Sequence, residues 1–244
     1  MLAAFAVLLP AYLLDARQLD GAAIWMKPLK FSLSLAIHFF TLAILAQQLE
    51  RSRRIGLTLL LTGYAAVASG LFEQIYISIQ AGRGQRSHFN IDTVWESLMY
   101  MLMGVGAVFL VLASFTLGVM IWKYGRKDGS GYRLGSIIGL IMGSVLTLLF
   151  AGYMSLSQSH SVGTALTTAS SVPLLGWSRT VGDLRVPHFL VTHIMQILPL
   201  LGWALDRYHR PSRTIVVIVA IALALLSAAL LTVSMAGKPV FPVL

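Results

Sequence analysis

The chain has 244 residues, of which 57% are hydrophobic and only 11% are charged, and its mean hydropathy is +0.80. Soluble domains carry about 25% charged residues, so this composition excludes an ordinary soluble protein and indicates a polytopic membrane protein. The net charge of +9 does not indicate nucleic-acid binding, because the basic residues stand in short loops between apolar segments, where they suit membrane topology and anionic headgroups. Because the chain has no cysteine, thiol chemistry, disulfides and iron–sulfur clusters are excluded.

Seven apolar segments have the composition of membrane helices. They cover residues 1–14, 28–48, 55–79, 94–121, 134–155, 187–206 and 213–236. The first is the shortest, because fourteen residues span only about 21 Å as a helix, and Pro10 interrupts it. A signal peptide is the alternative interpretation, but no Lys or Arg precedes its apolar run. We therefore expect a single all-α membrane domain, residues 1–244, built as a seven-helix bundle.

Basic residues in the loops predict the orientation of this bundle. The loops after the second, fourth and sixth segments contain ten Lys or Arg residues, whereas the opposite loops contain seven over longer stretches. The positive-inside rule then places the N-terminus in the cytoplasm and the C-terminus outside, in a cytoplasmic (inner) membrane. The outer loops, 15–27, 80–93 and 156–186, are longer and richer in polar side chains, so we expect the functional side to be extracytoplasmic.

The second segment carries a stripe of polar residues. On a helix, Lys27, Lys30, Ser34, His38 and Thr41 fall within an arc of about 80°. An ionisable side chain at mid-membrane costs roughly 2.5 kcal/mol or more, and it usually faces the bundle interior or a water-filled cavity. The stripe therefore predicts an intramembrane site. The structural alternatives are that His38 bonds a neighbouring helix and that both lysines extend to the headgroups.

Three further segments carry polar residues that are expected near the outer side. These residues are Ser69, Glu73, Tyr76 and Gln80 in the third segment, Asp92, Glu96 and Tyr100 in the fourth, and Arg185, His188, Thr192, His193 and Gln196 in the sixth. The loop 80–93 adds Arg83, Arg86 and His88. Because His38 and His193 both fall about 9–15 Å below the outer boundary, we expect the four polar faces to form one site. The structural alternatives are an ion pair of Glu73 with Lys30 or Arg83, and solvation of Glu96 at the interface.

Two histidines on different helices at one depth favour a cofactor or metal site. Six-coordinate haem requires one imidazole on each face of the ring, and His38 and His193 are the candidates. The residues predicted to bind haem b are His38, His193, Lys30, Arg83, Arg86, His88, Arg185, His188 and Gln196, with the basic ones as partners of the propionates. Alternatively, His38, His193 and Glu73 bind a single transition-metal ion. In either case Glu73 and Glu96 are the predicted catalytic, proton-handling groups of a redox or catalytic protein.

Two other functions stay open. A transporter or receptor-like binder of a small anionic or proton-coupled ligand would use a wet cavity lined by Lys, Arg, His and Glu; against it, no duplicated half with paired broken helices is visible. A metal-free acid–base enzyme acting on a lipidic substrate would use Glu73 or Glu96 as proton donor. The expected partners are therefore the lipid bilayer and a small anionic or lipidic ligand. Retinal-type photochemistry is disfavoured, because the seventh segment has no lysine for a Schiff base.

Overall fold

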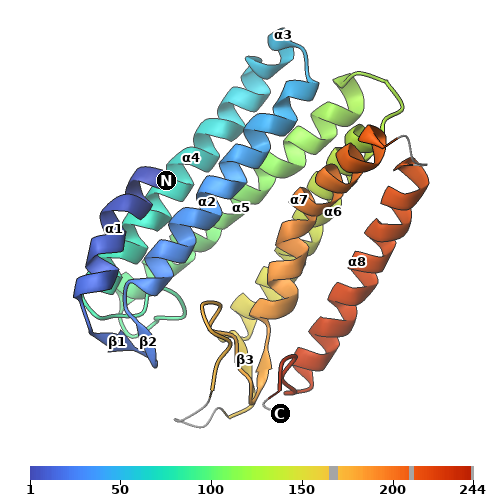
Figure 1. The fold of residues 1–244 in the computed structure, drawn as a ribbon. Coiled ribbons are helices and arrows are strands. Elements are labelled where there is room, and N and C mark those ends of the chain that lie inside the picture. The colour runs from blue at the N-terminus through green and yellow to red at the C-terminus, as the bar shows by residue number, and fades with distance from the viewer. Residues whose placement is uncertain (165–169, 209–211, 243–244) are drawn as a thin grey trace. The chain divides into compact units, whose positions relative to one another are not determined.

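Figure 1 shows a computed structural model of the chain, which describes residues 1–164, 170–208 and 212–242. The long helices are α1 (Leu2–Leu14), α2 (Met26–Leu45), α4 (Leu57–Gly82), α5 (Val94–Tyr124), α6 (Gly131–Leu156), α7 (Arg185–Arg207) and α8 (Ser212–Met235). The short elements are the helix α3 (Arg51–Arg54), a 3-10 turn at Ala46–Gln48, and the strands β1 (Gln18–Leu19), β2 (Ala22–Ala23), β3 (Ser161–Val162) and β4 (Gly182–Asp183). Each of the seven predicted segments overlaps one of these long helices.

Five of the described helices are long and apolar enough to cross a membrane, namely α2 with its 3-10 turn, α5, α6, α7 and α8. The apolar helix α1 has only 13 residues. Although α4 has 26 residues, it is not among the five, because polar residues such as Glu73, Gln74 and Gln80 lower its hydropathy. The protein is therefore mostly helical, with helices suited to a membrane. The seven-span count, the orientation and the identity of the membrane stay predictions.

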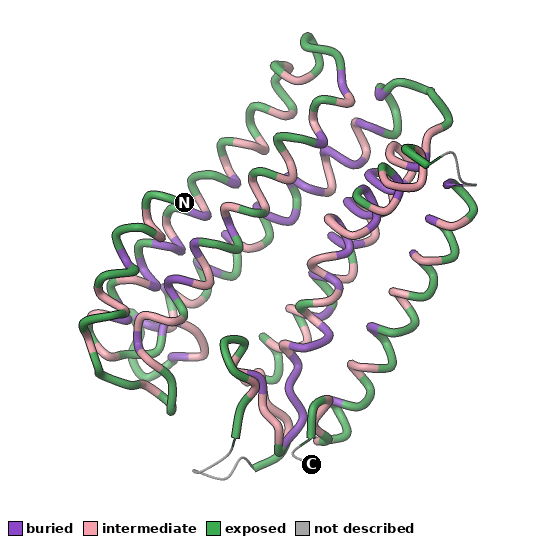
Figure 2. The backbone as a smooth tube through the Cα atoms, viewed as in Figure 1, coloured by how far each residue is buried: buried purple, intermediate pink, exposed green. Residues whose placement is uncertain are grey.

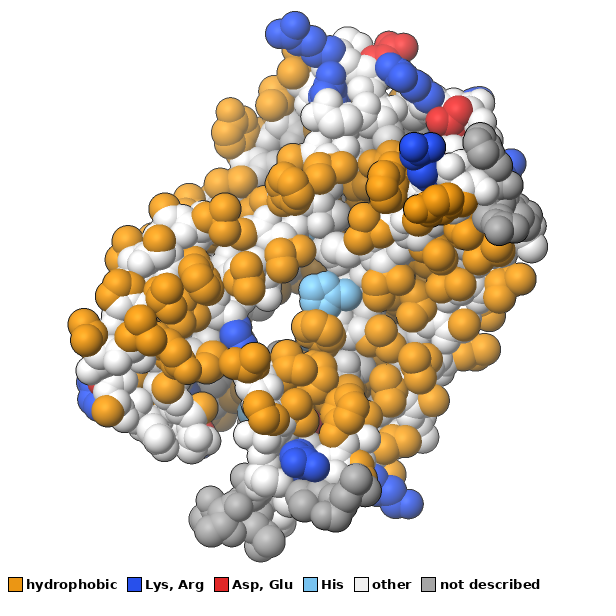
Figure 3. Space-filling view, viewed as in Figure 1, with side chains coloured by type: hydrophobic (Ala, Val, Ile, Leu, Met, Phe, Trp, Pro, Cys, Tyr) orange, Lys and Arg blue, Asp and Glu red, His pale blue; other side chains and the backbone are white. Residues whose placement is uncertain are grey.

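The surface of the helices supports a membrane location. Figure 2 shows that the long helices bury residues along one side and leave the rest exposed. Hydrophobic side chains cover much of the visible helical surface in Figure 3, and Lys and Arg gather near helix ends. Exposed apolar side chains include those of Leu61, Ile75 and Met101. Because soluble monomers rarely expose large contiguous apolar patches, such surfaces are suited to lipid.

The chain divides into two compact units. The N-terminal unit comprises Met1–Gln47 and Arg51–Ala113, and the C-terminal unit comprises Gln48–Glu50 and Ser114–Leu244. The boundary therefore falls inside α5. The expected organisation as a single membrane domain, residues 1–244, stays a prediction.

In the N-terminal unit, apolar residues of α2, α4 and α5 form two cores. One contains Leu35, Ala66, Leu110 and Ala113, and the other contains Tyr76, Ile77, Met99 and Met103. Before α2, strands β1 and β2 pair as an antiparallel hairpin. Its turn residues Asp20 and Gly21 have φ angles of 52° and 77°, and two positive φ angles are typical of a tight type I′ turn. The hairpin thereby places Asp20 at its tip.

In the C-terminal unit, glycines on α6 allow close contact with α7. A Cβ at Gly135 would lie 2.2 Å from the backbone oxygen of Leu198, and one at Gly139 would lie 3.0 Å from that of Ile194. Small residues spaced by four are a common means of bringing membrane helices together. Around this contact the core contains Phe150, Val191, Ile194, Leu198 and Ala220. Beyond the helices, β3 and β4 pair antiparallel.

Candidate functional site

Helices α2, α4 and α5 and the loop 83–93 bring titratable side chains together in the N-terminal unit. These residues, which we call the polar cluster, are Lys27, Glu73, Tyr76, His88 and Glu96. The charge of Lys27 acts on both Glu73 and His88, and the charge of Glu96 acts on Tyr76. The structure thus brings three predicted site residues, Glu73, His88 and Glu96, into one neighbourhood.

Glu73 is the most deeply buried charged residue of the polar cluster. The residue is 3% exposed, and its Oε1 atom has no hydrogen bond to any of the described residues. A Cβ at Gly106 of α5 would lie 2.9 Å from this oxygen, so the glycine leaves the space that the carboxyl group occupies. A buried carboxylate without hydrogen bonds is so costly that a proton or a cation neutralises it. Glu73 is therefore placed to bind one or the other.

His38 and Glu73 both contact α5, at positions about one helical turn apart. Its ring contacts the backbone of Leu110, four residues along α5 from Gly106, which corresponds to about 6 Å along the helix. The ring meets Phe39 edge-on, with centroids 5.6 Å apart. Within the described chain, no group hydrogen-bonds the buried Nε2 atom of His38. That nitrogen is therefore available to a ligand or to a water molecule.

His88 lies in the loop after α4, and its ring is near that of Tyr100, with centroids 6.2 Å apart. Its Nδ1 atom is 3.2 Å from the hydroxyl oxygen of Ser87. Burial of the ring, together with the nearby charge of Lys27, lowers the pKa of His88 below its ordinary value. The imidazole is therefore neutral at pH 7, which is the form that binds metals and accepts hydrogen bonds. Lys30, one turn after Lys27 on α2, is half-buried.

Both predicted anion-binding arginines of the loop 80–93 have partners within the N-terminal unit. Arg86 donates from Nε and Nη2 to the two carboxylate oxygens of Asp20, at 2.8 and 2.6 Å. Arg83 donates from Nη1 to Oε1 of Gln80, at 3.2 Å. Since Asp20 lies at the tip of the β1–β2 hairpin, the Arg86 pair ties this hairpin to the loop. An anionic ligand would have to compete with Asp20 for Arg86.

The polar face of α7 is in the C-terminal unit. His193 Nδ1 is 3.3 Å from Gln196 Oε1, and its ring contacts that of Phe189 at a centroid distance of 4.2 Å. Thr192 donates its hydroxyl to the backbone oxygen of His188, at 2.8 Å. The buried Nδ1 atom of His188 accepts or donates no hydrogen bond among the residues described. Their spacing predicts that these four residues share one face of α7.

Arg185, at the start of α7, forms an ion pair with the buried carboxylate of Asp183. Its Nη2 atom lies 2.6 Å from Asp183 Oδ2, and its Nε atom donates to Oδ1 at 2.9 Å. The backbone N–H groups of Ser178 and Arg185 also donate to this carboxylate. Burial alone would raise the pKa of Asp183, but these hydrogen bonds and the charge of Arg185 hold the pKa below its ordinary value. Arg185 therefore stabilises the loop before α7 in addition to any role toward a ligand.

Three residues that matter here were not singled out by sequence reasoning. Gln74, which is 4% exposed, donates to the backbone oxygen of Pro28 at 3.3 Å and so ties α4 to α2. Gly106 makes room for Glu73, and Asp183 pairs with Arg185. The available signals were a second polar residue beside Glu73, a glycine inside an apolar helix, and an aspartate just before a helix start.

Joint ligation by His38 and His193 stays a prediction, because the first belongs to the N-terminal unit and the second to the C-terminal unit. Across residues 1–164, 170–208 and 212–242, no three His, Asp or Glu side chains form a group that could hold a metal ion. Haem with two axial histidines does not require such a group. The single-ion site of His38, His193 and Glu73 also stays a prediction.

No protein-family model matches the chain, and no curated protein or solved structure is significantly similar to it. Functional inference therefore rests on the chemistry of the site itself. The polar cluster offers the firmest basis, because its members belong to one compact unit and include a buried carboxyl oxygen without a described partner.

Proposed function

We propose that the chain is an integral membrane protein that binds and releases a proton at Glu73, coupled to a small anionic ligand held near the polar cluster. The observation that supports this most directly is the Glu73 carboxyl group, which is buried and receives no hydrogen bond at Oε1 from the described residues. Ionisable groups inside membranes commonly belong to proton relays and substrate pathways. A proton-coupled binder or transporter uses such a group directly.

Lys27 provides the link between the proton and an anion. Its charge acts on Glu73, so it stabilises the carboxylate when the proton leaves. When Glu73 is protonated, the same lysine can attract an anionic ligand instead. Lys27 is exposed in the first turn of α2, where a small anion can reach it. Protonation of Glu73 and binding of the anion therefore favour each other, which is the linkage that coupling requires.

Tyr76 and Glu96 offer a route for the proton. Tyr76 follows Glu73 by about one turn of α4, and the charge of Glu96 acts on it. One oxygen of Glu96, Oε2, is buried and also receives no hydrogen bond from the described residues. In this arrangement a proton enters at Glu96, near the start of α5, and passes by way of Tyr76 to the Glu73 carboxylate. Gly106 leaves the space that the Glu73 carboxyl group occupies in this arrangement.

Reaction with a hydrophobic carbodiimide tests the proposal without knowledge of the ligand, because this reagent modifies protonated carboxyl groups in apolar surroundings. We expect mass spectrometry of the full chain in liposomes to locate the adduct at Glu73 at neutral pH and to find none in Glu73→Gln. Glu50, an exposed carboxylate after the 3-10 turn, is the matched control and should stay unmodified. Equal modification of Glu50 and Glu73, or none at Glu73, would contradict the proposal.

Proton-driven uptake then tests the coupling to an anion. Acetate, succinate and inorganic phosphate serve as probes in proteoliposomes with an acidic exterior. We expect the wild-type chain and Glu50→Gln to take up one of them in a proton-dependent manner, and Glu73→Gln to lose this uptake. Uptake that is equally fast in Glu73→Gln would refute a role for this carboxyl group in coupling.

Haem binding is the second candidate, and the buried Nε2 atom of His38 favours it. We propose that His38 would hold the haem iron, with Lys30, Arg83 and Arg86 of the same unit near the propionates; the second ligand, His193, stays a prediction. Haem bound in this way would supply electron-transfer chemistry. A Soret band in the purified protein that disappears in His38→Ala and His193→Ala, and persists in the loop variant His160→Ala, would support it. Stoichiometric iron, zinc or copper without this band would favour the bare metal ion.

A further inference from the structure

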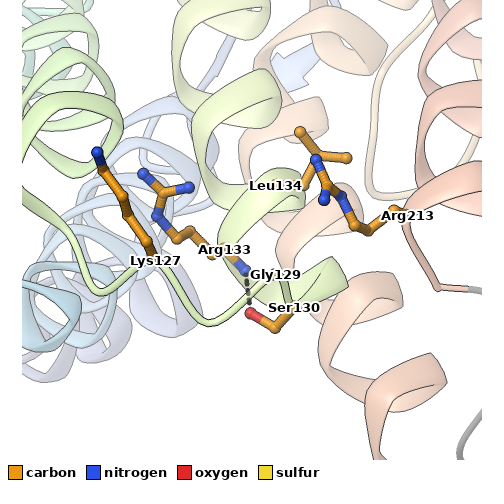
Figure 4. A pocket seen from close by; sticks show the side chains of 6 residues that line it. All are labelled: Lys127, Gly129, Ser130, Arg133, Leu134 and Arg213. Atoms are coloured by element: carbon orange, nitrogen blue, oxygen red, sulfur yellow. Dashed lines mark hydrogen bonds between the residues drawn. The ribbon is translucent and has the colours of Figure 1, made fainter.

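A basic pocket lies in the C-terminal unit, where α5 ends and α6 and α8 begin (Figure 4). Its cavity has a volume of about 220 Å³ and is lined by Lys127, Gly129, Ser130, Arg133, Leu134 and Arg213. The three cations come from three parts of the chain: the α5–α6 loop, the first turn of α6 and the first turn of α8. Figure 4 shows Lys127 and Arg133 extending in the same direction and Arg213 approaching beside Leu134.

The guanidinium group of Arg133 is held in a fixed position at this pocket. Its Nη2 atom donates to the backbone oxygens of Ile121 and Trp122, at 3.2 and 2.9 Å. Its Nε atom is buried, and no acceptor for it exists among the described residues. An oriented guanidinium group is suited to hydrogen bonding with phosphate oxygens through the terminal donors that the two backbone oxygens leave unused. Lys127 and Arg213 are exposed and can add their charges.

Acidic groups near the pocket are already engaged. Both oxygens of Asp206 accept the backbone N–H groups of Gly131 and Tyr132, at 2.9 and 2.7 Å. Asp128 accepts the N–H and the hydroxyl of Ser130, and its charge also acts on Arg133. The start of α6 is therefore capped by protein carboxylates. Even with Asp128 counted, three cations leave the pocket with an excess of positive charge.

Aromatic side chains place this pocket at the level of a membrane interface. Trp122 and Tyr124 in the last turn of α5 are 58% and 44% exposed, and Trp203 of α7 is 57% exposed. Trp203 follows Gly202, whose added Cβ would lie 2.2 Å from the backbone oxygen of Gly131, so Trp203 is level with the start of α6. Exposed Trp and Tyr gather at headgroup depth in membrane proteins.

We propose that this pocket binds the phosphate group of an anionic ligand, namely the headgroup of an acidic phospholipid. Arg133 provides the oriented donor, and Lys127 and Arg213 provide charge from either side. Leu134 gives the pocket an apolar wall beside which the glycerol backbone and the start of an acyl chain can pack. Basic pockets between membrane helices at headgroup level are known to recognise anionic lipids in this way. The site is separate from Glu73 and does not depend on the proposed coupling.

Native mass spectrometry of the full chain provides the test. The protein in detergent with phosphatidylcholine is titrated with phosphatidylglycerol, and the fraction that retains the acidic lipid is measured. For the double variant Lys127→Gln/Arg213→Gln we expect the apparent affinity to fall about 25-fold, roughly fivefold for each charge removed near an anionic headgroup. Lys238→Gln, which removes an exposed charge beyond the other end of α8, is the matched control and should bind as the wild-type chain does.

A further variant and a competing anion show whether the phosphate group belongs to a lipid or to free phosphate. Arg133→Lys, which keeps the charge but removes the planar guanidinium group, should also weaken binding; its unfolding temperature should fall as well, because the hydrogen bonds to the Ile121 and Trp122 oxygens are lost. Inorganic phosphate that displaces phosphatidylglycerol at low millimolar concentration would support the phosphate site and assign it to a free anion. Equal retention of phosphatidylglycerol by the wild-type chain and the double variant would overturn the proposal, as would equal retention of phosphatidylcholine and phosphatidylglycerol.

Discussion

Each unit of the protein buries a carboxyl group, and the two groups have opposite surroundings. In the C-terminal unit, Asp183 is fully buried and accepts hydrogen bonds from two backbone N–H groups and from the guanidinium group of Arg185. In the N-terminal unit, Glu73 is nearly as buried, yet its Oε1 atom receives none from the described residues. Breaking a hydrogen-bonded buried ion pair is costly, whereas a buried ionisable group without partners is a candidate functional group. The lack of partners, more than burial, distinguishes the candidate site.

Removal of the Asp183 charge should have the largest effect on stability. In Asp183→Asn the buried charge pair with Arg185 is broken, which typically costs about 3–5 kcal/mol. Because the Arg185 side chain is 34% exposed, we expect the free energy of unfolding in detergent to fall by about 3 kcal/mol, at the lower end of that range. Asp92→Asn, at an exposed loop position, is the control. Equal losses of unfolding free energy in both variants would show that the Asp183 carboxylate does not specifically stabilise the fold.

Lowering the pH should also remove the stabilisation that the ionised Asp183 provides. The pKa of Asp183 is lower in the folded chain than its ordinary value, so the folded state favours the ionised form. Its stabilisation is therefore complete above the unfolded pKa of about 3.9 and is lost as the pH falls from there through the folded pKa. We expect acid unfolding of the wild-type chain to contain a component below about pH 4 that Asp183→Asn lacks. Parallel stability curves for the two proteins would contradict this assignment.

A methyl group at Gly106 should disturb the unpaired carboxyl group. Its Cβ would lie 2.9 Å from Glu73 Oε1, so we expect Gly106→Ala to lower the free energy of unfolding by about 1–3 kcal/mol. Gly104→Ala on the same helix is the control, because nothing lies within 4 Å of its added Cβ. In a Glu73→Ala background the cost of Gly106→Ala should largely disappear. A cost that is unchanged in that background would show that Glu73 does not occupy this space.

The exposed ion pair of Arg86 and Asp20 should have the smallest effect. Its side chains are 60% and 55% exposed, and such pairs typically contribute about 0–1 kcal/mol. We expect Arg86→Gln to lower the free energy of unfolding by less than about 1 kcal/mol, and less at high salt. A loss of unfolding free energy as large as that of Asp183→Asn would show that solvent exposure does not decide how much an ion pair stabilises this protein.

The helices could be predicted closely from the sequence, because apolar runs of membrane length leave little choice. The predicted segment 94–121 corresponds to α5 at Val94–Tyr124, and 134–155 corresponds to α6 at Gly131–Leu156. The expectation of seven spans is least supported at α1, which has only 13 residues, and at α4, whose polar residues lower its hydropathy. Glu73 and its polar neighbours indicate a site. The same residues lower the mean hydropathy by which a membrane span is identified. A helix that carries buried ionisable residues therefore gives a weaker membrane signal.

The partners of the site residues were harder to predict. Helical spacing places Glu73 and Tyr76 on one face, but the space at Gly106 depends on the register between α4 and α5, which spacing does not contain. Similarly, the pairing of Arg86 with Asp20 depends on a hairpin turn and a loop meeting. Charge patterns in the sequence therefore predict where ionisable groups gather, and only the packing of helices decides which of them remain unpaired.

Infrared difference spectroscopy of the reconstituted chain tests the central claim, that Glu73 carries a proton within the N-terminal unit. At neutral pH we expect the carbonyl stretch of a protonated carboxylic acid, which is absent from Glu73→Gln and retained in Asp183→Asn and Glu50→Gln. Addition of alkali should remove this band as Glu73 loses its proton to solvent. A spectrum without a protonated carboxyl group at neutral pH, or one in which the band persists in Glu73→Gln, would contradict the account.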